Sequence, residues 1–305
     1  MGNFLSVYWD VNPEIVAIGP MHLRYYGILM VGGFFAAYML VRHMFRREQL
    51  SQRLFDSFAI SVVVSTLIGM RLGHCLFYQP EMFIESPLEV FLPVRFSPRF
   101  EFIGYQGLAS HGGAIGILLG VWWWCHKHKR HYMWAIERVI IAVPLVGALI
   151  RLGNLMNSEI YGTTTDLPWG FIFALRHEIT PHHPTQLYEA LSYAIIFLIM
   201  WGLYTRRFTK MKRGMAFGLF LILLFGIRFA IEFIKQPQVD FEASMALNMG
   251  QLLSLPFIVA GIILLWWSRK YGKPAMDTGA PAQSAGTKTQ SAGRKVKNKR
   301  SKNKR

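Results

Sequence analysis

Three arginines stand inside long apolar segments of the sequence. Arg71, Arg151 and Arg228 are each flanked by mainly apolar residues. A cationic side chain at the centre of a bilayer costs about 2.5–3.5 kcal/mol on insertion scales, so such a residue usually faces the protein interior and binds a partner or a ligand. Ion pairs that hold helices together are one explanation. The sequence offers four acids as partners: Glu137, Glu159, Glu189 and Glu232.

A site for an anionic headgroup is the other explanation, and the residues around Arg151 favour it. Asn154 follows three residues later, on the same face of a helix, and Glu159 stands about two turns on. A guanidinium binds phosphate with two parallel hydrogen bonds, and an amide can bind hydroxyl or ester oxygens. Arg228 and Glu232, four residues apart, also share a helix face.

A histidine and a strip of glycines open another apolar segment. His111 precedes Gly112, Gly116 and Gly120, which repeat every four residues. Small residues at this spacing let two helices approach closely, so the strip alone indicates helix packing. An unperturbed imidazole changes charge close to neutral pH, so His111 is a candidate proton acceptor, with a hydrogen-bonding anchor as the alternative.

Polar residues also open two further apolar segments. One begins His183-Pro184-Thr185-Gln186-Leu187-Tyr188-Glu189. Thr185 is expected to cap the helix, which leaves Gln186, Tyr188 and Glu189 together in an apolar setting. The other begins with Tyr25 and Tyr26, where an aromatic belt at the membrane surface is the alternative to a role in a site.

The elements that position these residues are predicted to be membrane spans. The chain has 305 residues, of which 52% are hydrophobic and 16% charged, whereas a soluble domain is about 25% charged. A span needs about 20 mostly apolar residues. The sequence holds about seven such blocks, at 23–42, 56–78, 107–126, 134–156, 187–205, 214–234 and 248–267. We therefore expect an all-α polytopic bundle of about seven transmembrane helices.

The basic residues between the spans predict the orientation. Alternate loops together with the C-terminal tail hold 25 Lys and Arg, and the opposite side holds five. Because basic loops stay cytoplasmic, the N-terminus is predicted outside and the C-terminus inside. The outer loops 79–106 and 157–186 are rich in Pro, Gly and aromatic residues and are expected to be ordered. The polar groups described above then face the outer leaflet.

Two regions are predicted, a transmembrane domain at 1–271 and a disordered basic cytoplasmic tail at 272–305. The formal net charge of +16 comes mostly from the tail, which argues against a nucleic-acid partner. Cys75 and Cys125 lie in apolar runs without the spacing of a disulfide framework or a metal site. Three histidines at 126–131 lie among basic residues and are interpreted as loop charge, so no metal ion is expected.

The motifs met so far occur together in one known family. They are Tyr-Tyr-Gly at 25–27, His-Gly-Gly-x-x-Gly at 111–116, Arg-x-Gly-Asn-x-x-Asn-x-Glu-x-Tyr-Gly at 151–162, His-Pro-Thr-Gln-Leu-Tyr-Glu at 183–189 and Arg-Phe-x-x-Glu-Phe at 228–233. Because it carries these motifs in this order, the chain resembles the prolipoprotein diacylglyceryl transferases over roughly residues 13–267. The motifs at 151–162 and 183–189 are highly specific for this family. The glycine strip that begins at 112 is weak evidence for it.

The resemblance implies an enzyme of bacterial lipoprotein maturation. Its substrates would be phosphatidylglycerol and prolipoproteins that carry a lipobox cysteine. The diacylglyceryl group would pass to the cysteine thiol, forming a thioether and releasing glycerol phosphate, without a cofactor. The enzyme would be a multi-pass protein of the inner membrane, with its active site toward the outer leaflet.

The resemblance also assigns residues. Those implied in catalysis are His111, Arg151, Arg228 and Tyr26. Those implied in substrate binding are Arg151, Asn154, Glu159, Arg228, Glu232, Gly112 and Gly113. On this interpretation the two arginines hold the leaving phosphate, and His111 takes the thiol proton. The two glutamates would position the arginines, because neighbouring cations make them poor bases.

The chain departs from the family pattern at three positions. Ile150 and Ser158 stand where the family usually has glycine, and Lys235 stands where many members carry arginine. The glycine losses put close backbone approach in doubt at those points. Lys235 keeps the charge but not the planar fork of a guanidinium.

Two other classes of protein remain as alternatives. An outer-leaflet protein that binds or transports anionic lipid would use the same arginines, although a transporter usually shows two repeated halves and none is visible in the sequence. A scaffold protein would not need Arg151, Asn154, Arg228 and His111 at one depth. The specific reaction is therefore an expectation from the resemblance.

Overall fold

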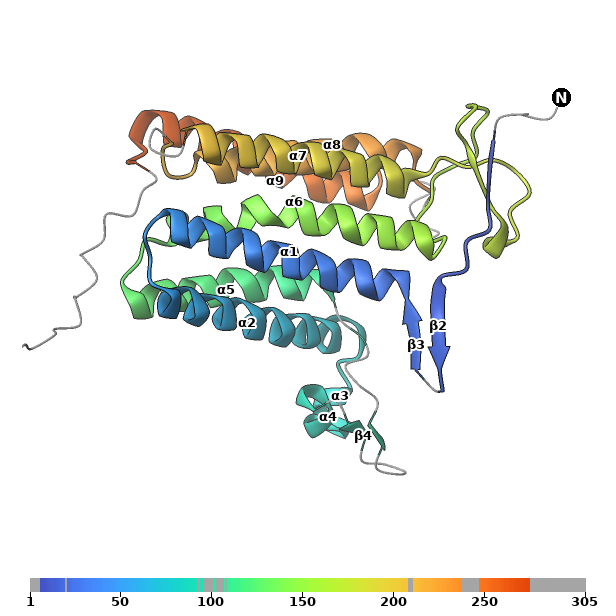
Figure 1. Ribbon diagram of the computed structural model, residues 1–305, viewed down its shortest axis with the longest axis horizontal. Coiled ribbons are helices and arrows are strands. Elements are labelled where there is room, and N and C mark those ends of the chain that lie inside the picture. The colour runs from blue at the N-terminus through green and yellow to red at the C-terminus, as the bar shows by residue number, and fades with distance from the viewer. Residues whose placement is uncertain are drawn as a thin grey trace, which may run out of the picture.

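Long, roughly parallel helices build the protein (Figure 1). The computed structural model describes residues 6–19, 21–92, 94–95, 101–102, 107, 109–207, 211–236 and 247–274. The long helices are α1 (Tyr25–Arg47), α2 (Gln52–Tyr78), α5 (Ser110–His128), α6 (Tyr132–Met156), α7 (Thr185–Arg207), α8 (Met215–Ile231) and α9 (Met249–Tyr271). Each coincides with one predicted span to within a few residues.

Six of these helices are long and apolar enough to cross a membrane, and α5 differs from them. It has 19 residues, and its two ends hold the polar residues His111, His126, Lys127 and His128. It nevertheless lies along α2 as part of the same bundle. The prediction of an all-α, polytopic membrane protein is therefore confirmed, and among the described residues six of the seven predicted spans meet this criterion.

The glycine strip brings α5 against α2. A Cβ atom on Gly112 would overlap the carbonyl oxygen of Gly69, and one on Gly73 would lie 2.7 Å from the Cα atom of Gly112. Gly116 approaches the backbone of Ser65 in the same way. Only glycine permits this backbone contact, so the packing role predicted for the strip is confirmed.

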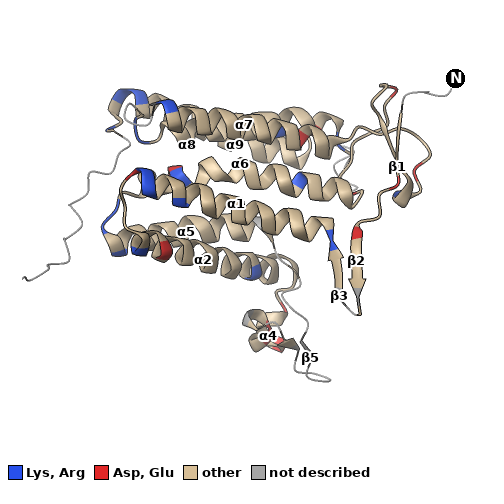
Figure 2. Ribbon diagram, viewed as in Figure 1, with Lys and Arg blue, Asp and Glu red and all other residues tan. Residues whose placement is uncertain are grey.

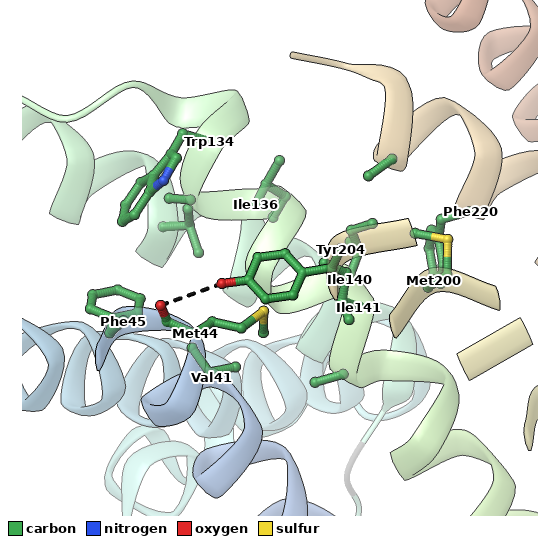
Figure 3. Packing of buried hydrophobic residues seen from close by; sticks show 14 of the residues in the cluster. Val41, Met44, Phe45, Trp134, Ile136, Ile140, Ile141, Met200, Tyr204 and Phe220 are labelled. Carbon is green, nitrogen blue, oxygen red and sulfur yellow. Dashed lines mark hydrogen bonds between the residues drawn. The ribbon is translucent and has the colours of Figure 1, made fainter. Parts of the chain in front are cut away.

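The hydrophobic core lies near the end of the bundle where α1 ends and α6 begins. Phe45, Trp134 and Met44 are fully buried there, and the hydroxyl of Tyr204 donates to the carbonyl oxygen of Met44 at 3.4 Å (Figure 3). A buried ion pair crosses the same region, with Arg138 Nε 2.8 Å from a carboxylate oxygen of Glu48. This pair ties the loop after α1 to α6.

Two charged residues, Glu137 and Arg71, were candidates for ion pairs inside the bundle. Both have backbone groups as partners in the structure. Glu137 accepts hydrogen bonds from the backbone N–H groups of Gly214 and Ala216, so it caps the start of α8 and is not a partner of an intramembrane arginine there. Arg71 donates to the carbonyl oxygens of Glu89 and Val90, at 2.6 and 3.0 Å respectively. It thereby fixes a short outer helix to α2.

Short elements cover the other end of the bundle. They are β1 (Val7–Trp9), β2 (Glu14–Ile18), β3 (Met21–Arg24), α3 (Met82–Glu85), α4 (Pro87–Phe91), β4 (Val94–Arg95), β5 (Glu101–Phe102), β6 (Phe171–Phe173), η1 (Ala174–Arg176) and η2 (Glu232–Ile234). β2 and β3 form an antiparallel hairpin, as do β4 and β5, while β1 pairs in parallel with β6. The described parts of the outer loops are thus ordered, as predicted. The N-terminal hairpin is a feature that the sequence did not predict.

The charges are unevenly divided between the two ends. Figure 2 shows Lys and Arg gathered where α1 meets α2, where α5 meets α6 and where α7 and α9 end. The opposite end, with the strands and the short helices, carries few of them. Apart from residues 272–274, the predicted basic tail lies outside the described residues.

Candidate functional site

Five helix ends bring the polar residues of the sequence motifs together. α6 and α8 end, and α1, α7 and α9 begin, at the end of the bundle that bears the hairpin (Figure 1). Neighbouring helices run antiparallel, so alternate helix ends fall on the same side of the bundle. Residues far apart in the sequence, such as Tyr26 and Arg228, therefore belong to one end of the molecule.

Arg151 is at the centre of the cluster. Its Nε atom lies 2.8 Å from a carboxylate oxygen of Glu189, and its Nη1 atom donates to the side-chain oxygen of Asn154 at 3.2 Å. The amide of Asn154 donates in turn to Glu159 at 2.7 Å. The side chain of Arg151 is 19% exposed while that of Glu189 is 1% exposed, so the accessible part of this pair is the cation.

A second cation lies on the other side of Glu189. The Nζ atom of Lys235 donates to Glu189 at 2.8 Å and lies 3.5 Å from Glu232. The three side chains are almost completely buried. Within the described part of the chain no ion pair joins Arg228 to Glu232, so the pairing that their spacing predicts is replaced by the pair of Glu232 with Lys235.

The loop after α6 is held in an unusual backbone conformation. Ser158 and Ile160 have φ angles of 52° and 62°, which L-residues with a side chain rarely adopt. The hydroxyl of Thr185 donates to the carbonyl oxygen of Ile160, and the amide of Gln186 donates to that of Glu159. These bonds stabilise the loop. The left-handed backbone at Ser158 explains why the family usually has glycine at that position. Thr185 is therefore the first residue of α7 and supports this loop, in place of the predicted helix cap.

Tyr26 and Arg228 border the same cluster. Tyr26 packs on Gly153, where a Cβ atom would come within 2.8 Å of its ring, and its hydroxyl interacts electrostatically with Glu159 and Arg151. Tyr193 lies one turn beyond Glu189 in α7. It interacts electrostatically with both Arg228 and Arg151. Five of the predicted site residues thus converge with Glu232 nearby: Tyr26, Arg151, Asn154, Glu159 and Arg228.

The structure does not bring His111 into this cluster. Its side chain is exposed in the first turn of α5. No hydrogen bond, ion pair or ring contact joins it to the arginine cluster in the ranges that the structure describes. Gly112 and Gly113 face α2, against Gly69 and Met70 respectively, so packing explains both glycines and a substrate contact stays a prediction.

Sequence reasoning assigned no site role to the most buried members of the cluster. The sequence indicates Glu189 as one of four acids and as part of an unexplained polar group with Gln186 and Tyr188, and Lys235 only as a departure from the family pattern. A signal for Glu189 was present, because an acid in an apolar helix needs a cation. Lys235 had no such signal in the sequence, because a lysine in an outer loop is expected to be solvated. Only the structure shows that it contacts Glu189 of α7.

The chain was compared with known protein families. A family model described as prolipoprotein diacylglyceryl transferase matches residues 13–267. The chain belongs to this family. The family predicted from the motifs is therefore confirmed, and with it the assignment to a transferase.

Individual members of the family are similar over nearly their whole length. A phosphatidylglycerol–prolipoprotein diacylglyceryl transferase of Bacteroides fragilis is 45% identical over 271 residues, which are 88% of this chain and 96% of that protein. The corresponding protein of Tolumonas auensis is 40% identical over 266 residues, 87% of this chain and 98% of its own. Family membership thus extends over the whole bundle that builds the arginine cluster.

Proposed function

We propose that the protein transfers the diacylglyceryl group of phosphatidylglycerol to the lipobox cysteine of prolipoproteins. The observation that carries this proposal is the guanidinium of Arg151, which Glu189 and Asn154 contact while the side chain stays partly exposed. A preoriented guanidinium at the membrane suits a phosphodiester headgroup. The names of the relatives in Bacteroides fragilis and Tolumonas auensis give phosphatidylglycerol and prolipoprotein as what those proteins act on.

The proposed reaction is a displacement at the glycerol carbon that carries the phosphate. The cysteine thiol loses its proton, and the thiolate attacks this carbon. A C–S bond forms as the C–O bond breaks, and glycerol phosphate leaves with the bonding electrons. Arg151 and Arg228 stabilise the negative charge on the leaving phosphate.

The other residues have supporting roles in this proposal. Asn154 binds headgroup oxygens, while Tyr26 orients the lipid against the arginines. Glu159 and Glu232 position the cationic side chains. His111 is the proposed general base, with Gly112 and Gly113 beside it at the substrate; its exposed side chain at the same end of the bundle is accessible to a peptide.

We further propose that the cluster faces the outer leaflet of the bacterial inner membrane. The cluster lies at the end with few basic residues, and the opposite end gathers Lys and Arg (Figure 2). Basic loops are retained in the cytoplasm, so this charge distribution supports an outward-facing cluster. Lipobox peptides that emerge from the membrane would meet phosphatidylglycerol there.

The reaction can be measured with purified components. The protein in detergent micelles is mixed with phosphatidylglycerol and a lipobox peptide, and mass spectrometry measures the mass added to the peptide. A peptide with serine in place of the cysteine is the matched control for the nucleophile. Phosphatidylethanolamine in place of phosphatidylglycerol is the control for the donor.

We expect a diacylglyceryl adduct on the cysteine peptide with phosphatidylglycerol only. If folded protein binds phosphatidylglycerol but gives no adduct, the transferase proposal is wrong. That result would instead favour an outer-leaflet protein that binds or transports anionic lipid through the same arginines.

A further inference from the structure

Lys235 is a buried lysine, and burial of a charged side chain calls for a structural or functional explanation. Its side chain is only 4% exposed, and its Nζ atom lies between two buried carboxylates, at 2.8 Å from Glu189 and 3.5 Å from Glu232. Removing one member of a buried group of charges leaves the others uncompensated, which is strongly unfavourable. The ammonium therefore determines where both carboxylates lie.

Glu189 connects this ammonium to Arg151. One of its carboxylate oxygens binds Lys235 and the other lies 2.8 Å from Arg151 Nε. Two cations on opposite oxygens hold the carboxylate between them, so it cannot turn fully toward either. The position of Arg151 thus depends on Lys235 although no direct contact between the two side chains is described.

The backbone around Lys235 is also fixed. Gly162 and Lys235 form an isolated antiparallel bridge, and Thr163 donates its backbone N–H to the carbonyl oxygen of Ile234 at 2.9 Å. Asn248, which caps α9, donates its side-chain amide to the carbonyl oxygen of Glu232. Segments from α6 to α9 therefore meet at this residue, and its ammonium has a defined place.

We propose that Lys235 is a positioning residue for the transfer reaction. Acting through Glu189, it holds the guanidinium of Arg151 in the orientation that receives the phosphate, and it neutralises Glu232. This inference rests on the proposed transferase function. It concerns how the arginine is oriented and assigns Lys235 no contact with the substrates.

The inference predicts a defined kinetic change. In Lys235→Met the two buried carboxylates lose their shared cation, and Glu189 is free to draw Arg151 toward itself. Because a displacement of about 1 Å at a reacting centre can cost about 10²-fold in rate, we expect kcat to fall by about that factor. The KM for the lipobox peptide should stay unchanged, because the peptide does not touch Lys235.

Three variants and one control test this in the mass-spectrometric assay. Lys235→Arg keeps a cation between the carboxylates and should recover most of kcat. Lys235→Gln keeps a donor without the charge, and it replaces Lys235→Met if that variant does not fold. Lys270→Met removes an exposed lysine at the opposite end of α9 and should leave kcat unchanged.

The outcomes separate this inference from the function on which it rests. An unmodified protein that gives no adduct would refute the proposed function itself. An active protein whose folded Lys235→Met and Lys235→Gln variants keep full kcat would refute only the positioning role. Loss of kcat in Lys235→Arg equal to that in Lys235→Met would also refute it, because the charge would then not be what matters.

Discussion

Among the individual residues, Arg151 has the contacts that a phosphate-binding arginine needs. Its Nε and Nη1 atoms are directed to Glu189 and Asn154, and the remaining surface of the side chain is partly exposed. A guanidinium can serve two partners and a ligand at once because its donors point in fixed, different directions. A lysine carries its donors on a single nitrogen, so it cannot present two parallel hydrogen bonds to a phosphate as a guanidinium does.

Arg151→Lys should therefore lose activity although the charge is kept. We expect kcat/KM for phosphatidylglycerol to fall by at least about 10²-fold, the order found when a donor to a developing charge is removed. Initial rates over a range of phosphatidylglycerol concentrations measure this. Arg53→Lys, at an exposed position in the first turn of α2, is the matched control. Equal rates in the two variants would mean that charge alone suffices.

Among the helices, the pair α2 and α5 depends on small residues. Gly112 contacts the backbone of Gly69 so closely that a single methyl group would overlap it. Overpacking of a close contact costs typically about 1–3 kcal/mol, since backbone must move to admit the new atoms. The helix that carries His111 is therefore held by this contact.

Gly112→Ala should lower the free energy of unfolding by about 1–3 kcal/mol. Thermal unfolding in detergent micelles, followed by intrinsic tryptophan fluorescence, measures the change. Gly32→Ala in α1, where an added Cβ would meet nothing within 4 Å, is the control and should be neutral or stabilising. A Gly112→Ala variant as stable as the unmodified protein would show that α2 and α5 pack less closely.

The loop between α6 and α7 is closed by a second polar group. Tyr161 donates its hydroxyl to Glu178 at 2.6 Å, and Glu178 also lies 3.0 Å from a ring nitrogen of the buried His182. The hydrogen bond from Tyr161 holds the pKa of the Glu178 carboxyl below its usual value of 4.5. Burial, together with the bond to Glu178, raises the pKa of Tyr161 to about 12, so the donor keeps its proton.

This group predicts an acid-sensitive loop. Because the pKa of Glu178 is lower in the folded protein, its contribution is complete above pH 4.5 and is lost as pH falls through the lowered value. Glu178→Gln should reduce the melting temperature at neutral pH and should flatten its dependence on pH below 4.5. Melting curves at several pH values measure both effects. An unchanged acid dependence in Glu178→Gln would assign that dependence to other carboxyl groups.

Over the molecule as a whole, the two ends of the bundle have different chemistry. One end gathers basic residues, and the other carries the strands and the short helices (Figures 1 and 2). The closely packed aromatic core lies toward the basic end, and the arginine cluster lies at the other. Because basic loops are retained in the cytoplasm, we propose that the basic end is cytoplasmic and that the cluster faces outward.

Cysteine labelling in intact cells tests this orientation. In a background without the buried Cys75 and Cys125, Asp166→Cys should react with a membrane-impermeant maleimide. Lys127→Cys, at the opposite end, should react only after the cells are permeabilised. The reverse pattern would place the arginine cluster on the cytoplasmic side.

The sequence predicts the helices of this molecule better than its contacts. Span positions depend on local hydropathy, so all the long helices were predicted, and the intramembrane arginines identified the cluster around Arg151. Glu189, the partner of Arg151, is among the four acids that the sequence offers. Which acid pairs with which cation could not be predicted, because Lys235 and Glu137 find their contacts through tertiary packing. Exposure of His111 likewise depends on how α5 is placed against α2.

The most direct test is the rate of adduct formation by Arg151→Ala against that of Arg53→Ala in detergent micelles with phosphatidylglycerol and the lipobox peptide. Both variants lose one guanidinium, but only Arg151 lies in the polar cluster at the end of α6. We predict that Arg151→Ala loses at least about 10²-fold in kcat, while Arg53→Ala keeps the rate of the unmodified protein. Equal rates in the two folded variants would contradict the assignment of the phosphate site to Arg151.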